Sequence, residues 1–178
     1  MKAQSEMVTF VLLFVIGILI FIAAIVWGRG VTEQNIDTAK IVSAERFMKS
    51  FNEQVESIVR SGGSQTISYP LNMEFRFVES GISDVLEIRD EIAGGVVPDN
   101  PIDITSPGSL GTIREWMDGP LFRIQLTYPL QDGTAIDFFT EGSITGTPKR
   151  ITIEKNSTFS MQVGGKEYEV VRLKITMQ

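Results

Sequence analysis

The distribution of apolar residues singles out the first part of the chain. Residues 7–27 form an uninterrupted run without a charged side chain, MVTFVLLFVIGILIFIAAIVW. At about 1.5 Å of rise per residue, this run makes a helix of roughly 31 Å, which matches a hydrocarbon core of about 30 Å. The run therefore predicts a membrane-spanning helix.

Two other interpretations of this run are less favoured. A secretory signal peptide has a shorter apolar region that ends in a small-x-small cleavage site, whereas this run continues into Trp27-Gly28-Arg29-Gly30. A core helix of a soluble domain would need a larger domain around it, because this segment is apolar on all its faces.

The next segment, residues 32–61, has the period of an amphipathic helix. It contains no proline or glycine, and apolar residues recur at spacings of three and four: Ile41, Ala44, Met48, Phe51, Val55 and Ile58. The opposite face carries the charges Glu33, Lys40, Glu45, Lys49, Glu53, Glu56 and Arg60. Gly62 and Gly63 supply a C-terminal stop. Residues 4–62 are predicted to form one long helix with a bend near Gly30; two separate helices are the alternative.

From residue 63 to residue 178 the apolar period changes to two, which predicts β-strands. Apolar residues alternate with polar ones in residues 65–77, where Pro70 implies an edge or a bulge. Alternation in residues 124–130 and 136–138 around Asp132-Gly133 predicts one hairpin, and Gly164-Gly165 predicts another. About seven strands result, which favours an antiparallel sandwich or a partly closed barrel. The predicted fold class is therefore α+β, a long N-terminal helix followed by an antiparallel β-sandwich-like head.

Residues 93–119 are the least regular part of the predicted head. Their prolines and glycines predict a long loop, with a brief helical turn at Thr112–Met117. Asp99 and Asp103 could offer oxygens to calcium, but the EF-hand pattern is missing and a solvated acidic face is favoured. No metal site is predicted.

Composition excludes several classes of function. The chain has no cysteine and no histidine, which removes Ser-His and Cys-His nucleophiles and thiolate or imidazole zinc sites. Carboxylate pairs such as Asp137 with Glu141 or Glu167 with Glu169 could act as the acid and base of a glycosidase, but acidic residues on the solvent-exposed face of a strand are the favoured explanation. A net charge of -6 without a Lys/Arg cluster argues against a nucleic-acid partner. We therefore expect no enzyme activity, no cofactor and no nucleic-acid binding.

The N-terminus carries the most specific motif. A very short head, Met1-Lys2-Ala3, precedes Gln4-Ser5-Glu6, and the apolar run comes directly after it. This arrangement resembles the class III signal peptide of archaeal type IV pilin-like proteins, in which a basic and a small residue precede the cut and a glutamine begins the mature chain. That family also has a long N-terminal helix, apolar in its first half, and a β-rich head.

The resemblance implies an organisation and a function. Residues 1–3 are then a leader that the prepilin peptidase removes between Ala3 and Gln4, residues 4–62 are the helix and residues 63–178 are the head. The chain would be a major or minor pilin that stays in the membrane until the pilus machinery assembles it. It would then form homo-oligomeric adhesive filaments on the cell surface. The candidate assembly residues are Glu6, Phe10, Phe14, Gly17, Phe21 and Trp27.

Glu6 has two interpretations. A charge beside an apolar run costs a few kcal/mol when it is placed deep in lipid, and pairing with a neighbouring α-amino group inside a helical bundle would relieve that cost. Alternatively, Glu6 lies at the level of the lipid headgroups. It is also closer to the start of the mature chain than the acidic residue of many pilins.

Two observations bear on orientation and on the alternative function. Positive charges are more numerous after the span than before it, which by the positive-inside rule would place the head in the cytoplasm. The pilin-like start and the glycosylation sequon at Asn156, expected in a turn, favour an external head instead. The alternative function is a single-pass membrane-anchored surface protein whose β-domain binds a ligand and does not polymerise.

Overall fold

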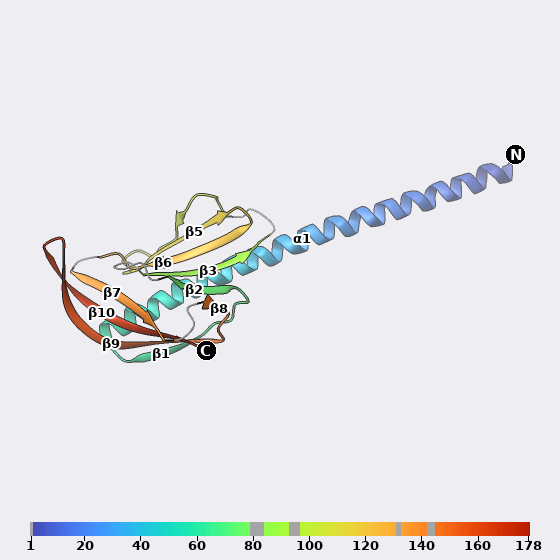
Figure 1. The fold of residues 1–178 in the computed structure, drawn as a ribbon. Coiled ribbons are helices and arrows are strands. Elements are labelled where there is room, and N and C mark those ends of the chain that lie inside the picture. The colour runs from blue at the N-terminus through green and yellow to red at the C-terminus, as the bar shows by residue number, and fades with distance from the viewer. Residues whose placement is uncertain (1, 79–83, 93–96, 131–132, 142–144) are drawn as a thin grey trace. The chain divides into compact units, whose positions relative to one another are not determined.

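The structure is a computed structural model of the chain (Figure 1). It describes residues 2–78, 84–92, 97–130, 133–141 and 145–178, with side chains from residue 9 onward. The chain divides into two units, residues 1–38 and residues 39–178, and each is described by itself below.

One α-helix, α1, covers Lys2–Ser61 and belongs to both units. It continues through Gly28 and Gly30, since an isolated glycine weakens a helix without breaking it. The helix ends at the predicted glycines. Gly62 has a φ of 74° and donates its N–H to the carbonyl oxygen of Ile58 at 2.8 Å, which caps the last turn.

The unit of residues 39–178 contains two sheets. The first has the order β1-β9-β10-β7 and consists of β1 (Ser64–Ser68), β9 (Arg150–Val163), β10 (Lys166–Met177) and β7 (Thr134–Thr140). The second has the order β4-β5-β6-β3-β2-β8 and consists of β4 (Ile102–Asp103), β5 (Thr112–Asp118), β6 (Leu121–Thr127), β3 (Val85–Glu91), β2 (Glu74–Val78) and β8 (Thr145–Gly146).

The core of this unit joins the amphipathic part of α1 to both sheets. The predicted apolar stripe is confirmed, since its residues from Ile41 to Ile58 are all buried. On the helix, Phe51 lies 6.1 Å, centroid to centroid, from Phe75 of β2. Between the sheets, Phe77 of β2 lies 6.3 Å from Phe138 of β7, edge to face. Aromatic rings thus connect all three layers of the core.

The α+β class with a β-rich head is confirmed, but several strands pair differently from the prediction. Residues 65–77 form two strands in different sheets, β1 and β2, because the chain leaves the first sheet around Pro70. β6 and β7 are not a hairpin; β7 instead pairs in parallel with β10. Asp132 lies outside the described residues. The hairpin at Gly164-Gly165 is confirmed, since β9 and β10 pair antiparallel on either side of it.

Residues 112–117 were expected to form a helical turn and instead belong to β5. Ile113, Glu115 and Met117 alternate inward, and β5 forms a hairpin with β6 around Gly119, which has a φ of 63°. Ten strands are present in the described ranges, three more than the approximate number expected. The strands that the sequence did not single out are β3, β5 and the two-residue strands β4 and β8, and residues 65–77 divide into β1 and β2. The two-residue strands are too short to carry a period-two signal.

Candidate functional site

The first candidate site is the apolar part of α1 in the unit of residues 1–38. Fifteen large apolar side chains between Phe10 and Trp27 are exposed. Phe10 is 72% exposed and Trp27 is 74% exposed. This helix is long and apolar enough to cross a membrane, and none of its most apolar window is buried. Since soluble monomers rarely expose contiguous apolar patches of this extent, the segment is compatible with a membrane anchor.

Helix geometry brings four of the predicted assembly residues together. At about 100° per residue, Phe10, Phe14, Gly17 and Phe21 fall within an arc of roughly 60°, and Ala24 and Gly28 extend the same face. The face therefore combines three phenylalanines with three small residues; we call it the Phe/Gly face. Trp27 lies about 100° away from Gly28 and does not belong to it. A Cβ placed on Gly17 meets no atom within 4 Å, so this position is open.

The other predicted residues lie at the start of α1 and on β9. Ala3, Gln4 and Glu6 belong to the backbone of α1, and their side chains lie outside the described residues. Asn156 is exposed and lies within β9, where the register with β10 shifts between Arg172 and Leu173. The expected turn at this sequon is therefore wrong; Asn156 is the extra residue of a β-bulge.

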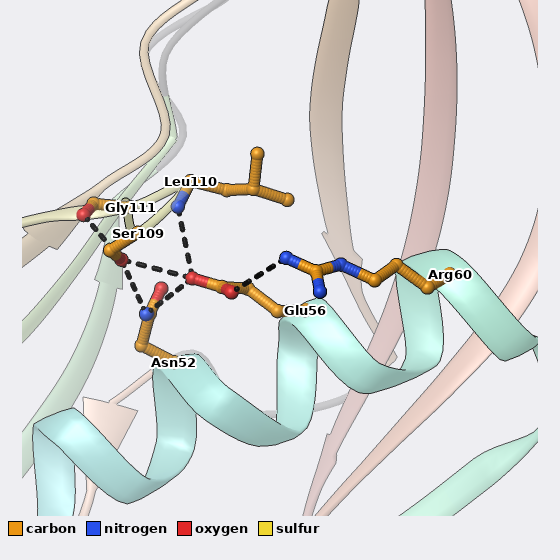
Figure 2. Close-up of polar contacts among 6 residues, drawn as sticks. All are labelled: Asn52, Glu56, Arg60, Ser109, Leu110 and Gly111. Atoms are coloured by element: carbon orange, nitrogen blue, oxygen red, sulfur yellow. Dashed lines mark hydrogen bonds and ion pairs between the residues drawn. The ribbon is translucent and has the colours of Figure 1, made fainter. Parts of the chain in front are cut away.

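A second site, which the sequence did not reveal, joins α1 to the loop before β5 (Figure 2). Glu56 Oε1 accepts hydrogen bonds from Asn52 Nδ2 at 2.8 Å, from Ser109 Oγ at 2.9 Å and from the Leu110 N–H at 2.9 Å. Glu56 Oε2 lies 3.4 Å from Arg60. We call this group, Asn52, Glu56, Ser109 and Leu110, the helix–loop clamp.

Glu56 was assigned from the sequence to the solvated face of the helix, and the clamp corrects that assignment. Burial alone would raise the pKa of the Glu56 carboxyl. The hydrogen bonds from Leu110, Ser109 and Asn52 and the charge of Arg60 outweigh burial, so the pKa lies below its ordinary value. A charged Glu56 therefore stabilises the folded unit above about pH 4.5, and this contribution is lost as the pH falls through its lowered pKa.

The chemistry of the clamp favours a structural role. Ser109 Oγ lies 2.9 Å from both Glu56 Oε1 and the Gly111 carbonyl oxygen, and its one proton serves a single acceptor at a time. A carboxylate with a lowered pKa is a weak base for activating that hydroxyl. The adjoining cavity of about 110 Å³, lined by Lys49, Glu53 and Pro107 among others, has room for only a few water molecules.

Gly111 allows the loop to approach this closely. A Cβ at this position would lie 2.6 Å from Leu126 Cδ1 and 2.9 Å from Tyr128 Cε1, and it would also collide with Asn52 Oδ1. The nearby Asn52 Oδ1 and Tyr128 hydroxyl have no hydrogen-bond partner among the described atoms. Close packing at Gly111 is thus achieved beside two unsatisfied polar atoms.

In the described structure, Asp137 and Glu141 are each paired with a different cation. Asp137 Oδ2 accepts a hydrogen bond from Arg172 Nε at 2.6 Å, and Glu141 forms an ion pair with Lys174. Glu167 and Glu169 are exposed on β10. Within the described ranges, no group of three or more Asp or Glu side chains could hold a metal ion.

No protein-family model, no curated protein and no solved structure matches this chain.

Proposed function

We propose that the protein is a structural subunit, a major or minor pilin, of an archaeal type IV pilus-like filament. The exposed apolar segment from Phe10 to Trp27 carries this proposal. It is followed by a unit whose own core includes the amphipathic end of the same helix. A chain built in this way can exchange lipid for neighbouring helices without unfolding its head.

The assembly step follows from the chemistry of the exposed segment. Apolar helices gain no hydrophobic energy from leaving lipid for one another, so close van der Waals packing has to drive their association. The Phe/Gly face offers such packing, because a Phe14 or Phe21 ring of one copy can fill the space above Gly17 of the next. A heterologous contact of this kind gives open-ended helical growth when the rotation between successive copies does not close a ring, and the proposal requires that case.

The leader and the head complete the proposal. Cleavage between Ala3 and Gln4 by a prepilin peptidase would free an α-amino group for Glu6 of a neighbouring copy. The β-rich heads would then cover the outside of the filament and carry adhesion, and Asn156, exposed on β9, would be available for glycosylation.

The first test is the native amino terminus together with the assembly state. Mass spectrometry of the protein from its native cells should show a chain beginning at Gln4, and electron microscopy of sheared surface filaments should detect this protein in them. An intact Met1, or a cut after Trp27 that releases the head, would remove the proposal's main support.

The second test uses two matched substitutions within the apolar segment. Gly17→Val adds bulk to the Phe/Gly face, whereas Ala23→Val adds similar bulk about 120° away from Gly17. Both keep the segment apolar, so both variants should enter the membrane normally. We expect Gly17→Val to reduce the filament yield at least about tenfold, which corresponds to about 1.4 kcal/mol of lost packing, and Ala23→Val to leave most of it. Equal yields for the two variants would contradict the role of this face.

The alternative is a single-pass membrane-anchored surface protein that does not polymerise. In this alternative the apolar helix serves only as a membrane anchor, and the head carries the function. Native protein that stays in the membrane fraction as a monomer, with no filaments, would favour this alternative.

A further inference from the structure

A concave patch lies on the outer face of the first sheet and shares no residue with the helix–loop clamp. It encloses about 220 Å³ and is lined by residues of β7, β9 and β10. These three strands are neighbours in the first sheet (Figure 1). Val170 and Ala135, 2% and 3% exposed, form its floor, and Phe159 and Met161 of β9 form one wall. We call this cavity the sheet pocket. Pockets for drug-sized ligands enclose about 300 to 1,000 Å³, so the smaller sheet pocket suits a single ring or a single side chain.

The register of the strands explains why these residues meet. Val170 of β10 is flanked by Phe159 of β9 on one side and by Ala135 of β7 on the other. Two residues further along β10, Arg172 is directly opposite Asp137 of β7. Because side chains alternate across a strand, both rows lie on the same face of the sheet. An apolar row therefore borders a polar row.

The polar row is formed by an ion pair that also contacts two aromatic rings. Arg172 Nε donates to Asp137 Oδ2 at 2.6 Å, and the guanidinium carbon lies 5.3 Å from the Phe159 ring centroid and 6.0 Å from the Phe139 ring centroid. The Arg172 side chain is nevertheless 45% exposed. The remaining N–H groups of Arg172 and Asp137 Oδ1 have no hydrogen-bond partner in the part of the chain that the structure describes. A donor group, the Arg172 guanidinium, and an acceptor, the Asp137 carboxylate, thus lie side by side at the rim of an apolar floor.

This chemistry selects a neutral ligand that has an apolar face and adjacent hydroxyl groups. An anion gains little, because Asp137 neutralises Arg172, and the nearby Lys174 is likewise paired with Glu141. A purely apolar ligand would leave the donors and the acceptor of the polar row buried without partners. A pyranose ring has C–H groups that pack on an aromatic ring such as Phe159, which is 39% exposed, and vicinal hydroxyls that both donate and accept hydrogen bonds.

We propose that the sheet pocket binds one neutral sugar residue of a glycan, with Phe159 stacking on the ring and Arg172 and Asp137 hydrogen-bonding two adjacent hydroxyls. This proposal concerns the head alone and does not depend on filament assembly.

The test measures binding to the full-length chain in dodecylphosphocholine micelles, whose headgroups carry no sugar. The probes are the methyl glycosides of glucose, galactose, mannose and N-acetylglucosamine, with methyl glucuronate as the charged comparison. Methionine ¹³C-methyl NMR reports on the pocket through Met161, whose signal is assigned with Met161→Leu. We expect a saturable shift of the Met161 signal with at least one neutral glycoside, half-complete in the millimolar range that suits a single-ring ligand.

Variants separate this site from non-specific binding. Phe159→Ala and Arg172→Gln should abolish the saturable shift. Arg150→Gln changes an exposed arginine of β9 that lies outside the sheet pocket, and this variant should keep the shift. Unchanged signals of the other methionines confirm that each variant is folded, and Phe159→Leu replaces Phe159→Ala if that variant unfolds. Asp137→Asn leaves Arg172 uncompensated and should make methyl glucuronate bind several-fold more tightly than the neutral glycosides.

Three results would overturn the proposal. The first is the absence of a saturable shift with all four neutral glycosides up to about 50 mM, well above the millimolar range expected. The second is tighter binding of methyl glucuronate than of the neutral glycosides by the unchanged protein. The third is wild-type binding by Arg172→Gln or Phe159→Ala.

Discussion

The two halves of α1 differ in how much of their apolar surface is buried. Phe14 in the first half is 63% exposed, whereas Phe51 in the second half is fully buried against the sheets. Residues 7–27 of the first half are apolar on every side and carry no charge, so water is a poor solvent for all of their faces. The second half confines its apolar residues to one stripe, which the head covers. The angular distribution of apolar side chains, rather than their presence, therefore separates a segment that needs lipid or other copies from one that completes a core.

The largest difference between the halves should appear when the same residue type is truncated in each. Phe51→Ala removes a ring that packs on Phe47 and Phe75, and we expect it to lower the free energy of unfolding of the head by about 3 to 5 kcal/mol. Phe14→Ala is the matched control and should leave head stability unchanged. Urea unfolding followed by the fluorescence of Trp116, in β5, measures both effects. A similar loss in the two variants would refute the division into halves.

A buried carboxylate facing the second half should make head stability depend on pH. Burial and the charge of Glu45 raise the pKa of Glu115 to about 7, although Lys49 opposes the shift. Glu115 is 5% exposed, and its Oε2 atom has no hydrogen-bond partner among the described atoms. Because the folded state holds this proton more tightly than the unfolded state, stability from this group is present below about pH 4.5 and is lost as the pH rises to about 7.

Glu115→Gln removes this titration. At pH 8 the variant should be more stable than the unchanged protein by an amount on the order of 3 kcal/mol, and at pH 4 the two should differ little. Urea unfolding across this pH range gives the comparison. Glu53→Gln, at an exposed position of the helix, is the control; it retains Glu115 and should keep the pH profile of the unchanged protein. Parallel pH profiles for Glu115→Gln and the unchanged protein would count against a raised pKa.

Two glycine-to-alanine substitutions should act in opposite directions. Gly111→Ala brings a methyl group into Leu126 and Tyr128, and overpacking of this kind should destabilise the head by about 1 to 3 kcal/mol. Gly28→Ala meets no atom within 4 Å and should stabilise the helix by about 0.5 to 1 kcal/mol. Urea unfolding of the head measures the first effect, and circular dichroism at 222 nm during heating measures the second. A neutral result for Gly111→Ala would mean that the loop can retreat from the helix without loss.

The smallest effect is expected at the edge of the helix–loop clamp. The Arg60 side chain is 69% exposed and lies 3.4 Å from Glu56, so Arg60→Ala should cost less than about 1 kcal/mol of head stability. Asn52→Ala removes a buried donor to Glu56 and should cost more, about 1 to 3 kcal/mol. The same urea titration ranks the two variants, and a reversed order would show that the ion pair holds the clamp.

Predictions from the sequence were accurate where the signal is local. The stripe from Ile41 to Ile58, the glycine stop at Gly62 and the hairpin at Gly164-Gly165 each depend on neighbouring residues, and the structure contains all three. Strand partners were harder to predict. Alternation in residues 65–77 looks the same whether they form one strand or two strands in separate sheets, and the parallel pairing of β7 with β10 joins segments about 35 residues apart.

The candidate sites divide in the same way. Exposure of the residues from Phe10 to Trp27 follows from a continuous apolar run, which the chain itself displays. The helix–loop clamp joins Glu56 to Ser109, and the sheet pocket joins Phe159 to Ala135, so both depend on contacts between distant segments. No periodicity marks such residues, because a polar residue on a helix face has the same spacing whether water or a folded loop covers it.

The sequence by itself determined the apolar first half of the helix, its amphipathic second half and the β-rich character of residues 63–178, because each depends on a repeat of apolar residues within a few turns or strands. Only the tertiary structure decided which strands share a sheet, that Glu56 is held by a loop, and that Arg172 and Asp137 border an apolar hollow. Those features arise from the packing of segments that are remote in the chain, where shape and burial select among pairings that local patterns leave equivalent.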